Sequence, residues 1–137
     1  MGLTHLDAGV IIGFLDANDA HHNTARAALT QILEQGDHIA MAASALAECL
    51  VGPARKGDAS IQLVRDALTQ LPVKIVDLNS EIAAEAARIR SRHRTLRLPD
   101  ALAIATAVVS DATQLVTTDR RWPTQHAMKL NVNITQI

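Results

Sequence analysis

The chain alternates between two spacings of hydrophobic residues, and each spacing predicts a different element. Short runs of apolar and β-branched residues predict strands at 3–7, 38–42, 73–78, 115–118 and 129–137. Apolar residues three or four positions apart predict helices at 10–15, 20–35, 44–51, 58–71, 79–94 and 99–110. Because strands and helices alternate, we expect an α/β/α sandwich with a central, mainly parallel sheet of four to five strands.

Residues that cap or break helices set several of the predicted ends. Asp19 is the expected N-cap of the helix at 20–35. Ser44 is the expected N-cap of the next helix, which Gly52 and Pro53 should bring to an end. In parallel sheets of this type ligands bind beyond the carboxyl ends of the strands, so residues that follow a strand are candidates for a site.

Composition limits the size and chemistry of the core. At 137 residues the chain has the length of one ordinary domain, and we expect residues 1–137 to form it. Hydrophobic residues make up 48% of the chain, yet Phe14 and Trp122 are its only aromatic residues, so the core must be aliphatic and rich in alanine. The single cysteine, Cys49, excludes an internal disulfide and fits a reducing compartment.

The sequence shows no sign of secretion or membrane insertion. No basic segment precedes the N-terminal apolar residues, and Asp7 interrupts them, so a signal peptide is not expected. The longest apolar run, 101–109, is far shorter than the roughly 20 residues that span a bilayer. We therefore expect a cytoplasmic protein. The net charge of −1 gives no overall attraction to nucleic acid, so any such attraction must be local.

Four acidic residues are candidates for a shared site because each stands among apolar neighbours: Asp7, Glu48, Asp100 and Asp119. Charged side chains are rarely buried without a partner. Asp7 and Asp119 follow predicted strands, and Asp100 should turn inward from the first turn of its helix. Simpler roles exist for these three, as a helix cap, a turn residue and a favourable first-turn charge, respectively. Glu48, expected in mid-helix, has no such role.

Electrostatics favours a bound cation over a cluster of bare carboxylates. Two carboxylates about 5 Å apart at an effective dielectric constant of about 20 repel each other by roughly 3 kcal/mol. Such a group must therefore take up protons or hold a cation. Oxygen ligands without Cys or paired His favour Mg²⁺ or Mn²⁺ over Zn²⁺. Because a water on such an ion can attack a phosphodiester, the acids predict metal-dependent phosphodiester hydrolysis.

The order of these segments resembles that of a PIN domain. The order runs from LDAGVIIGFL, through Glu48 in an apolar helix, to LPDALAIATAVV and then LVTTDRRW, and it covers essentially the whole chain. Within that family, the chain looks like the small single-domain ribonucleases of the VapC toxin type. This resemblance implies a PIN-like α/β/α fold in which one or two Mg²⁺ or Mn²⁺ ions are bound by Asp7, Glu48, Asp100 and Asp119.

The resemblance also implies an activity and partners. The expected reaction is endonucleolytic cleavage of RNA, often structured RNA such as tRNA or rRNA, with mRNA as a further possible substrate. Homodimerisation is expected. A cognate VapB-type antitoxin is expected to inhibit the enzyme by laying its C-terminal segment over the active site.

Two positions depart from the pattern of the family. Many PIN domains carry Ser or Thr two residues after the first Asp, where this chain has Gly9, so a hydroxyl near the metal is expected to be missing. Thr117 precedes Asp119 by two residues on the same strand face and could supply one. Some relatives carry another acid three residues beyond the last Asp. Trp122 occupies that position here, so we expect no fifth ligand.

Arginines flank the predicted site in sequence and are candidates for binding RNA phosphates: Arg92, Arg94, Arg97, Arg120 and Arg121. Phosphate contacts would give affinity without choice of base sequence. The simpler explanation of the first group is a solvated helix end, where cations complement the helix dipole. Because aromatic side chains are almost absent, recognition of RNA shape is favoured over base stacking.

Two non-catalytic alternatives remain open. A receiver-like domain phosphorylated at Asp77 would need an acidic pair after its first strand and a lysine after its last. This chain has Asp7 followed by Ala8, and it lacks that lysine. The second alternative is a PIN-like regulatory domain that only binds partners, although all four acids are present.

Overall fold

The computed structural model describes residues 2–137, and its strands form one parallel sheet. The strands are β1 (Leu3–Leu6), β2 (His38–Ala42), β3 (Val73–Val76), β4 (Gln114–Thr117) and β5 (Asn133–Gln136). Their order across the sheet is β3-β2-β1-β4-β5, and every neighbouring pair is parallel. The predicted parallel sheet of four to five strands is therefore confirmed.

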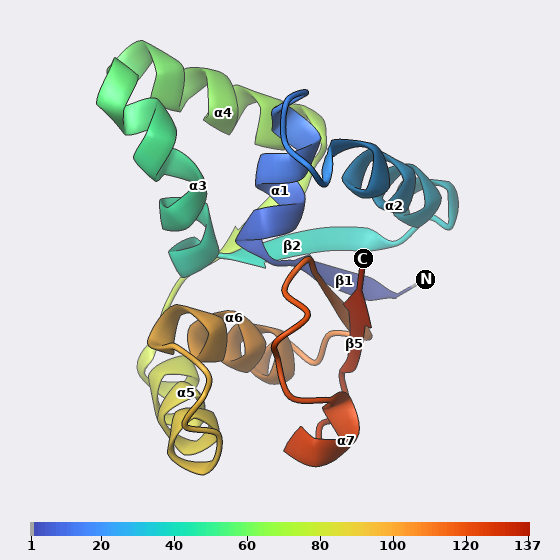
Figure 1. The fold of residues 1–137 in the computed structure, drawn as a ribbon, viewed down its shortest axis with the longest axis vertical. Coiled ribbons are helices and arrows are strands. Elements are labelled where there is room, and N and C mark those ends of the chain that lie inside the picture. Colours follow the sequence, from blue (N-terminus) through green and yellow to red (C-terminus); the bar gives the residue numbers. More distant parts are fainter. Residues whose placement is uncertain (1) are drawn as a thin grey trace.

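Helices cover both faces of the sheet, and each face is covered by consecutive helices (Figure 1). One face carries α1 (Ala8–Leu15), α2 (His22–Glu34), α3 (Ala43–Lys56) and α4 (Asp58–Gln70). The other face carries α5 (Ser80–Arg92), α6 (Leu98–Val109) and α7 (Gln125–Met128). The result is the predicted α/β/α sandwich, with an aliphatic core on each side. No helix within residues 2–137 combines the length and apolar character needed to cross a membrane.

The position of β1 determines where a site can form. The chain lays down β1, β2 and β3 in one direction across the sheet, then crosses through α5 and α6 to place β4 on the other side of β1. After β1 the chain enters α1 on one face, whereas after β4 it turns toward α7 on the other face. The carboxyl ends of β1 and β4 thus form the topological switch point, where ligands bind in open sheets of this kind.

The predicted end of the third helix at Gly52 and Pro53 is wrong. The structure continues α3 to Lys56, with Pro53 inside the helix, and Gly57 with a φ of +123° follows it. A proline inside a helix lacks the N–H for one hydrogen bond, and its ring crowds both the carbonyl four residues earlier and the Cβ of the preceding residue. That residue is Gly52, which has no Cβ, so the local clash that usually stops a helix is reduced.

Both predicted N-caps are also wrong. The second helix begins at His22 with His21 as its N-cap, while Asp19 accepts a 2.8 Å hydrogen bond from the His21 N–H within the preceding turn. The third helix starts directly after β2, so Ser44 lies inside its first turn. Asp19 thus stabilises the turn before the second helix instead of capping it, and the third helix begins where β2 ends.

The last strand starts later than the predicted 129–137, and a short helix that the sequence did not predict precedes it. The helix α7 is capped by Thr124, whose Oγ1 accepts a 3.0 Å hydrogen bond from the Ala127 N–H. It closes at Lys129, which has a φ of +55°. Only residues from Asn133 onward pair with β4. Four residues are too few for helical periodicity to register in a sequence pattern.

Candidate active site

Asp7 is buried where β1 ends and α1 begins. It is 8% exposed, and its Oδ2 accepts a 2.9 Å hydrogen bond from the hydroxyl of Thr117 in β4. Its backbone N–H donates to Val116 O at 2.9 Å, which ties the end of β1 to β4. Although Asp7 occupies the N-cap position of α1, its side chain makes no capping hydrogen bond. The carboxylate is therefore directed to the switch point and does not stabilise the helix as a cap.

Asp100 is the third residue of α6 and is also 8% exposed. Its Oδ2 accepts a 3.3 Å hydrogen bond from the Arg97 backbone N–H and lies 3.5 Å from Arg97 Nε. Pro99 pre-forms this first turn because its fixed φ suits the start of a helix. Asp100 thus has the expected first-turn role and also turns inward, as the apolar residues that follow it predict.

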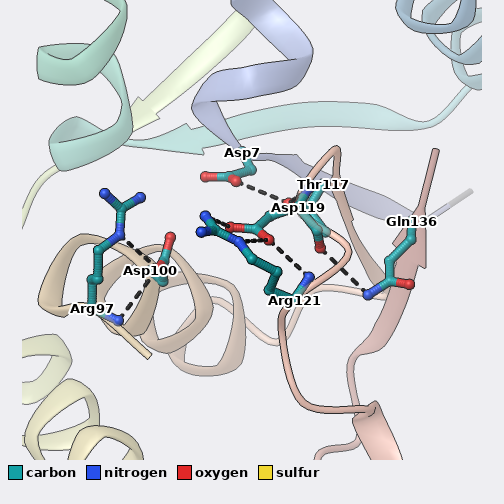
Figure 2. A network of polar contacts seen from close by, with 7 residues as sticks. All are labelled: Asp7, Arg97, Asp100, Thr117, Asp119, Arg121 and Gln136. Atoms are coloured by element: carbon teal, nitrogen blue, oxygen red, sulfur yellow. Dashed lines mark hydrogen bonds and ion pairs between the residues drawn. The ribbon is translucent and has the colours of Figure 1, made fainter. Parts of the chain in front are cut away.

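Asp119 lies two residues beyond β4 and is fixed through its backbone (Figure 2). Its N–H donates to Thr117 Oγ1 at 3.1 Å, and its carbonyl oxygen accepts from Gln136 Nε2 at 3.4 Å. Its carboxylate accepts hydrogen bonds from the Arg121 backbone N–H at 2.8 Å and from Nε and Nη2 of the same residue at 3.2 Å. Thr117 therefore bridges two acids, since its hydroxyl donates to Asp7 and accepts from Asp119.

Glu48 lies in α3, at the margin of the site. Its side chain is exposed and lines a pocket between α1, α3 and α4. Partial burial raises the pKa of the Glu48 carboxyl, and the charges of Asp7 and Asp100 raise it further, whereas Arg97 lowers it. Because α3 contacts both α1 and α6, the charges of Asp7 and Asp100 affect the Glu48 carboxyl although its side chain is exposed.

The surroundings of Asp7 and Asp119 shift the pKa values of these two acids in opposite directions. Burial raises the pKa of the Asp7 carboxyl, the hydrogen bonds from Thr117 and the Ala8 N–H lower it, and the charges of Asp100 and Asp119 raise it again. The hydrogen bonds from Arg121 hold the pKa of Asp119 below its usual value. Burial is thus the largest cause of the raised pKa values of Asp7 and Glu48, and repulsion between Asp7 and its acidic neighbours adds to it.

The donor set fits a hard divalent cation in its chemistry. Every candidate ligand is a carboxylate, and a cation beside Asp7 would offset the burial and the repulsion that raise its pKa. Within residues 2–137, no three His, Cys, Asp or Glu side chains converge closely enough to enclose an ion. Mg²⁺ usually takes one or two protein carboxylates and keeps several waters, so Asp7 with one further acid is a sufficient contribution. The shared binding of one ion by all four acids stays a prediction.

The arginines divide into two groups. Arg97 and Arg121 contact the acids, pairing with Asp100 and Asp119, respectively, as Figure 2 shows. The other three are exposed, and none of them forms an ion pair within residues 2–137: Arg92, Arg94 and Arg120. Arg92 lines a separate pocket beside α7, and Arg94 lines a shallow surface formed mainly by α5.

The structure also shows features that the sequence pattern did not reveal. A side chain at Gly9 would overlap the hydroxyl of Thr118, so the place expected to lack a hydroxyl contains one from the neighbouring strand end. No sequence signal identifies this contact, because it joins residues more than one hundred positions apart. Trp122, which we expected not to be a ligand, is buried in the core on the α5–α6 side. Asp77 is exposed after β3, and β2 separates that strand from β1.

The fold and the site together define a class. The chain is a parallel α/β/α sandwich with buried carboxylates at its switch point, where open sheets of this kind bind ligands. The model of one family, the PIN domain, matches residues 5–125, so the chain belongs to the PIN domain family. The resemblance predicted from the sequence is confirmed. A comparison with curated proteins found no match.

Structures that contain VapC toxins share this fold. The chain is similar to VapBC2 from Rickettsia felis bound to a DNA fragment from its promoter, with a TM-score of 0.74, 16% identity and 98% of both chains covered. It is similar to VapBC-1 from nontypeable Haemophilus influenzae, with a TM-score of 0.70, 15% identity, and 98% and 97% covered. It is also similar to VapC20 from Mycobacterium tuberculosis, described as a toxin that cleaves the sarcin-ricin loop. The TM-score is 0.69 and the identity 16%, with 86% of this chain and 91% of that chain covered.

Proposed function

We propose that this chain is a Mg²⁺- or Mn²⁺-dependent endoribonuclease that acts as the toxin of a toxin–antitoxin pair. The observation that carries the proposal is the burial of Asp7 and Asp100 beside Asp119 at the switch point of the sheet. Membership of the PIN domain family and the likeness to VapC folds support the same class of activity. The cytoplasm, where RNA substrates are available, is the proposed location.

Each acid has a proposed role. Asp7 is the principal metal ligand, because the Thr117 hydroxyl donates to its Oδ2, while no side chain within residues 2–137 donates to its Oδ1. Asp100 and Asp119 are further ligands, and Glu48 approaches from the rim. When bound, the ion supplies an activated water for attack on the phosphodiester and neutralises charge that develops on it. Thr117 is a positioning residue that keeps Asp7 and Asp119 at a fixed separation.

The arginines are proposed to bind the phosphates of the RNA. Arg97 and Arg121 are the first candidates, because they already lie against the acids and their side chains are 67% and 82% exposed. The exposed guanidinium groups of Arg92, Arg94 and Arg120 would extend this contact along the backbone. The proposed substrates are structured RNAs, tRNA or rRNA, or an mRNA, recognised by shape more than by base stacking.

A VapB-type antitoxin is the proposed protein partner. The pocket beside Glu48 is lined by α1, α3 and α4, and apolar side chains stand exposed on it, including Ile12, Leu15 and Leu63. A partner segment with apolar side chains would cover this surface and reach the acids through Glu48. The VapBC assemblies from R. felis and H. influenzae support such a partner. A homodimer is also proposed, and sedimentation of the purified chain tests it.

One observation favours a non-catalytic alternative, a PIN-like domain that only binds partners. Arg97 and Arg121 already neutralise part of the acidic group, so the acids could serve a charge network without any ion. The two functions differ in what a metal does. The enzyme must bind Mg²⁺ or Mn²⁺ through Asp7, whereas the charge network needs no metal.

The test is cleavage of total cellular RNA by the purified protein with Mg²⁺, with Mn²⁺ or with EDTA, followed by mapping of new 5′ ends. The variant Asp7→Asn is assayed in parallel, and circular dichroism establishes that it is folded. We expect discrete cuts that require metal and disappear in Asp7→Asn. Absence of cuts with every metal, from a folded wild-type protein that binds its partner, would favour the non-catalytic alternative.

A further inference from the structure

A groove between α7 and β5 adjoins the acidic group on the side of Asp119. Its volume is about 820 Å³, and its walls come from the segment 123–131 and from Ile134 and Gln136 of β5. Gln136 forms the end nearest the acids, since its Nε2 donates to the Asp119 carbonyl oxygen at 3.4 Å (Figure 2). The α7–β5 groove therefore begins beside the site and runs from it along the outer strand of the sheet.

Hydrogen-bond donors and cations line the α7–β5 groove, and none of its lining residues is Asp or Glu. Its polar side chains are those of Thr124, Gln125, His126, Lys129, Asn131 and Gln136. Lys129 is exposed and forms no ion pair within residues 2–137. By contrast, the pockets beside Glu48 and beside Arg92 each include carboxylates. The α7–β5 groove is thus suited to a ligand with negative charge.

Lys129 has an unusual backbone conformation in the wall of this groove. Its φ is +55°, in the left-handed region where glycine or asparagine usually closes a helix. The turn is held by its own hydrogen bonds, because the Lys129 N–H donates to His126 O at 3.1 Å. Gln125 Nε2 donates to Leu130 O at 3.3 Å across the same turn. The turn therefore presents an unpaired ammonium group, within residues 2–137, on a fixed backbone.

We propose that the α7–β5 groove binds the sugar–phosphate backbone of the RNA on one side of the cleaved bond, and that Lys129 contacts a phosphate there. The inference rests on the proposed function and adds a binding surface to it. An endonuclease cuts within a strand, so the RNA must continue from the acids in two directions. Arg97 and Gln136 lie on opposite sides of the acids in Figure 2, and the α7–β5 groove continues from the Gln136 side.

The outer edge of β5 also suits a different ligand, a protein segment that pairs with it as a further strand. Two observations favour RNA. The groove is continuous with the acids through Gln136, which a strand added to the edge of β5 does not require. Strand pairing uses backbone groups, whereas the groove offers cationic and amide donors on side chains, the groups that bind phosphate and sugar oxygens.

The experiment measures RNA binding in EDTA, where the proposed metal-dependent cleavage cannot occur. The probe is a short fluorescein-labelled oligouridylate, and its anisotropy is followed at several salt concentrations. The variants are Lys129→Gln, Lys129→Gly and Asn131→Asp. Lys74→Gln is the matched control for the lysine, because exposed Lys74 lies on β3 at the opposite edge of the sheet. Asn133→Asp is the matched control for the asparagine, because exposed Asn133 lies on β5 outside the lining of the groove.

Each phosphate contact on a single strand contributes about 0.7 to the slope of log affinity against log salt concentration. We expect Lys129→Gln and Lys129→Gly to lower this slope by about 0.7 and to weaken binding several-fold at low salt. Asn131→Asp should also weaken binding, because its carboxylate repels phosphate. Lys74→Gln and Asn133→Asp should bind like the wild type. Urea unfolding should show Lys129→Gly as stable as the wild type, since glycine suits a positive φ, so its loss of binding is not a loss of folding.

Cleavage then locates the groove relative to the cut. For an RNA with a mapped cut, shortening the strand on one side of the cut should remove the difference in kcat/KM between the wild type and Lys129→Gln. Shortening it on the other side should preserve that difference. A difference that survives both truncations would overturn the inference, because Lys129 would then act without holding either flank of the strand.

Further results would overturn the inference while leaving the proposed function intact. Unchanged RNA affinity in Lys129→Gln and Asn131→Asp would leave the edge of β5 to a protein strand. Equal losses in Lys129→Gln and Lys74→Gln would mean that only the overall charge matters. A folded wild type that cleaves no RNA with any metal would overturn the proposed function itself, and one that also fails to bind the oligouridylate would overturn both.

Discussion

The two ends of the central strands carry polar groups in opposite arrangements. At the amino end, Asp37 accepts hydrogen bonds from the Gly2 N–H at 3.0 Å and the Thr4 hydroxyl at 3.2 Å, and Gln114 donates in turn to Thr4 at 3.0 Å. One carboxylate there is matched by two donors. At the carboxyl end, the charges of Asp100 and Asp119 act on Asp7, whose one side-chain donor within residues 2–137 is the Thr117 hydroxyl.

This difference distinguishes a polar network that stabilises the fold from one that is suited to binding a ligand. The network of Asp37 is satisfied within the protein, so it can stabilise the pairing of β1 with its neighbours. At the other end, burial raises the pKa of Asp7, and the charges of Asp100 and Asp119 raise it further. Unfavourable charge concentrated at a switch point is typical of a functional site, because a bound cation would relieve it.

The largest expected effect contrasts the two ends through their acids. Asp7→Asn should lower metal-dependent RNA cleavage by at least about 100-fold, a loss typical of removing one group that acts on the transition state. Asp37→Asn, the same change at the amino end, should leave cleavage within a few-fold of the wild type. Rates of cleavage of a mapped RNA site measure both. Equal losses in the two variants would erase the functional distinction between the ends.

The middle of β1 provides a second prediction through His5. Burial lowers the pKa of His5 from 6.5 to about 4, and its Nε2 has no partner within residues 2–137. Because the unfolded chain takes up this proton first, stability is full above pH 6.5 and falls as the pH drops toward 4. The loss should reach about 3 kcal/mol for a shift of this size.

Urea unfolding in EDTA from pH 7.5 to 4 measures the effect of His5. His5→Leu should flatten this acid-dependent loss of stability, because leucine takes up no proton. The acids near Asp7 are present in both proteins, so their own contributions cancel in the comparison. If the variant lost stability as steeply as the wild type, burial of His5 would not be the source of the acid sensitivity.

Much of this architecture follows from the sequence alone. Alternating strand and helix patterns predict the sandwich, and β2 begins and ends at the predicted residues. The errors fall where a neighbouring element overrides a local signal. Pro53 should have ended α3, but the glycine before it lets the helix continue. The helix α7 was missed because four residues carry too little periodicity to be recognised.

The sequence predicts which acids are candidates for the site, but not their burial or their contacts. Apolar neighbours identify Asp7 and Asp100, and both are buried. Glu48 has similar neighbours in sequence yet is exposed, because its side of α3 borders a pocket. The pairing of Arg121 with Asp119 and the overlap of Gly9 with Thr118 depend on how loops close in space, which no spacing along the chain reveals.

A smaller effect contrasts the stabilities of the two ends in the absence of metal. Asp7→Asn should raise the free energy of unfolding in EDTA at pH 7 by on the order of 1 kcal/mol, within the usual range for single substitutions. Asp37→Asn should lower it by a similar amount, because one of its donors would face an amide nitrogen.

The pH dependence fixes the sign of the Asp7 effect. Because burial raises the pKa of Asp7 in the folded protein, its contribution favours folding at low pH and is lost as the pH rises above 3.8. The advantage of Asp7→Asn should therefore disappear on acidification. An Asp7→Asn protein less stable than the wild type at neutral pH would show that the carboxylate holds the fold, as Asp37 does.

The smallest effect tests whether the arginines already stand in for the cation. Arg121→Gln removes a guanidinium from Asp119, and its side chain is 82% exposed, so solvent weakens the pair. We expect Mg²⁺ affinity to rise a few-fold at low salt and less at high salt, since one competing positive charge is gone. The pKa of Asp119, which Arg121 lowers, should move back toward 3.8, so acid should abolish metal binding at a higher pH.

Arg88→Gln is the matched control for this last effect. Arg88 pairs with Glu85 at 2.8 Å on α5, so its loss should leave metal affinity unchanged. RNA affinity should respond in the opposite sense to metal affinity, falling in Arg121→Gln because a phosphate contact is lost. Calorimetry with Mg²⁺ and filter binding of RNA in EDTA measure the two quantities separately. If Mg²⁺ affinity stayed the same while RNA affinity fell, Arg121 would bind phosphate without competing with the cation, and the excess negative charge at this end would rest on Asp7 and Asp100 alone.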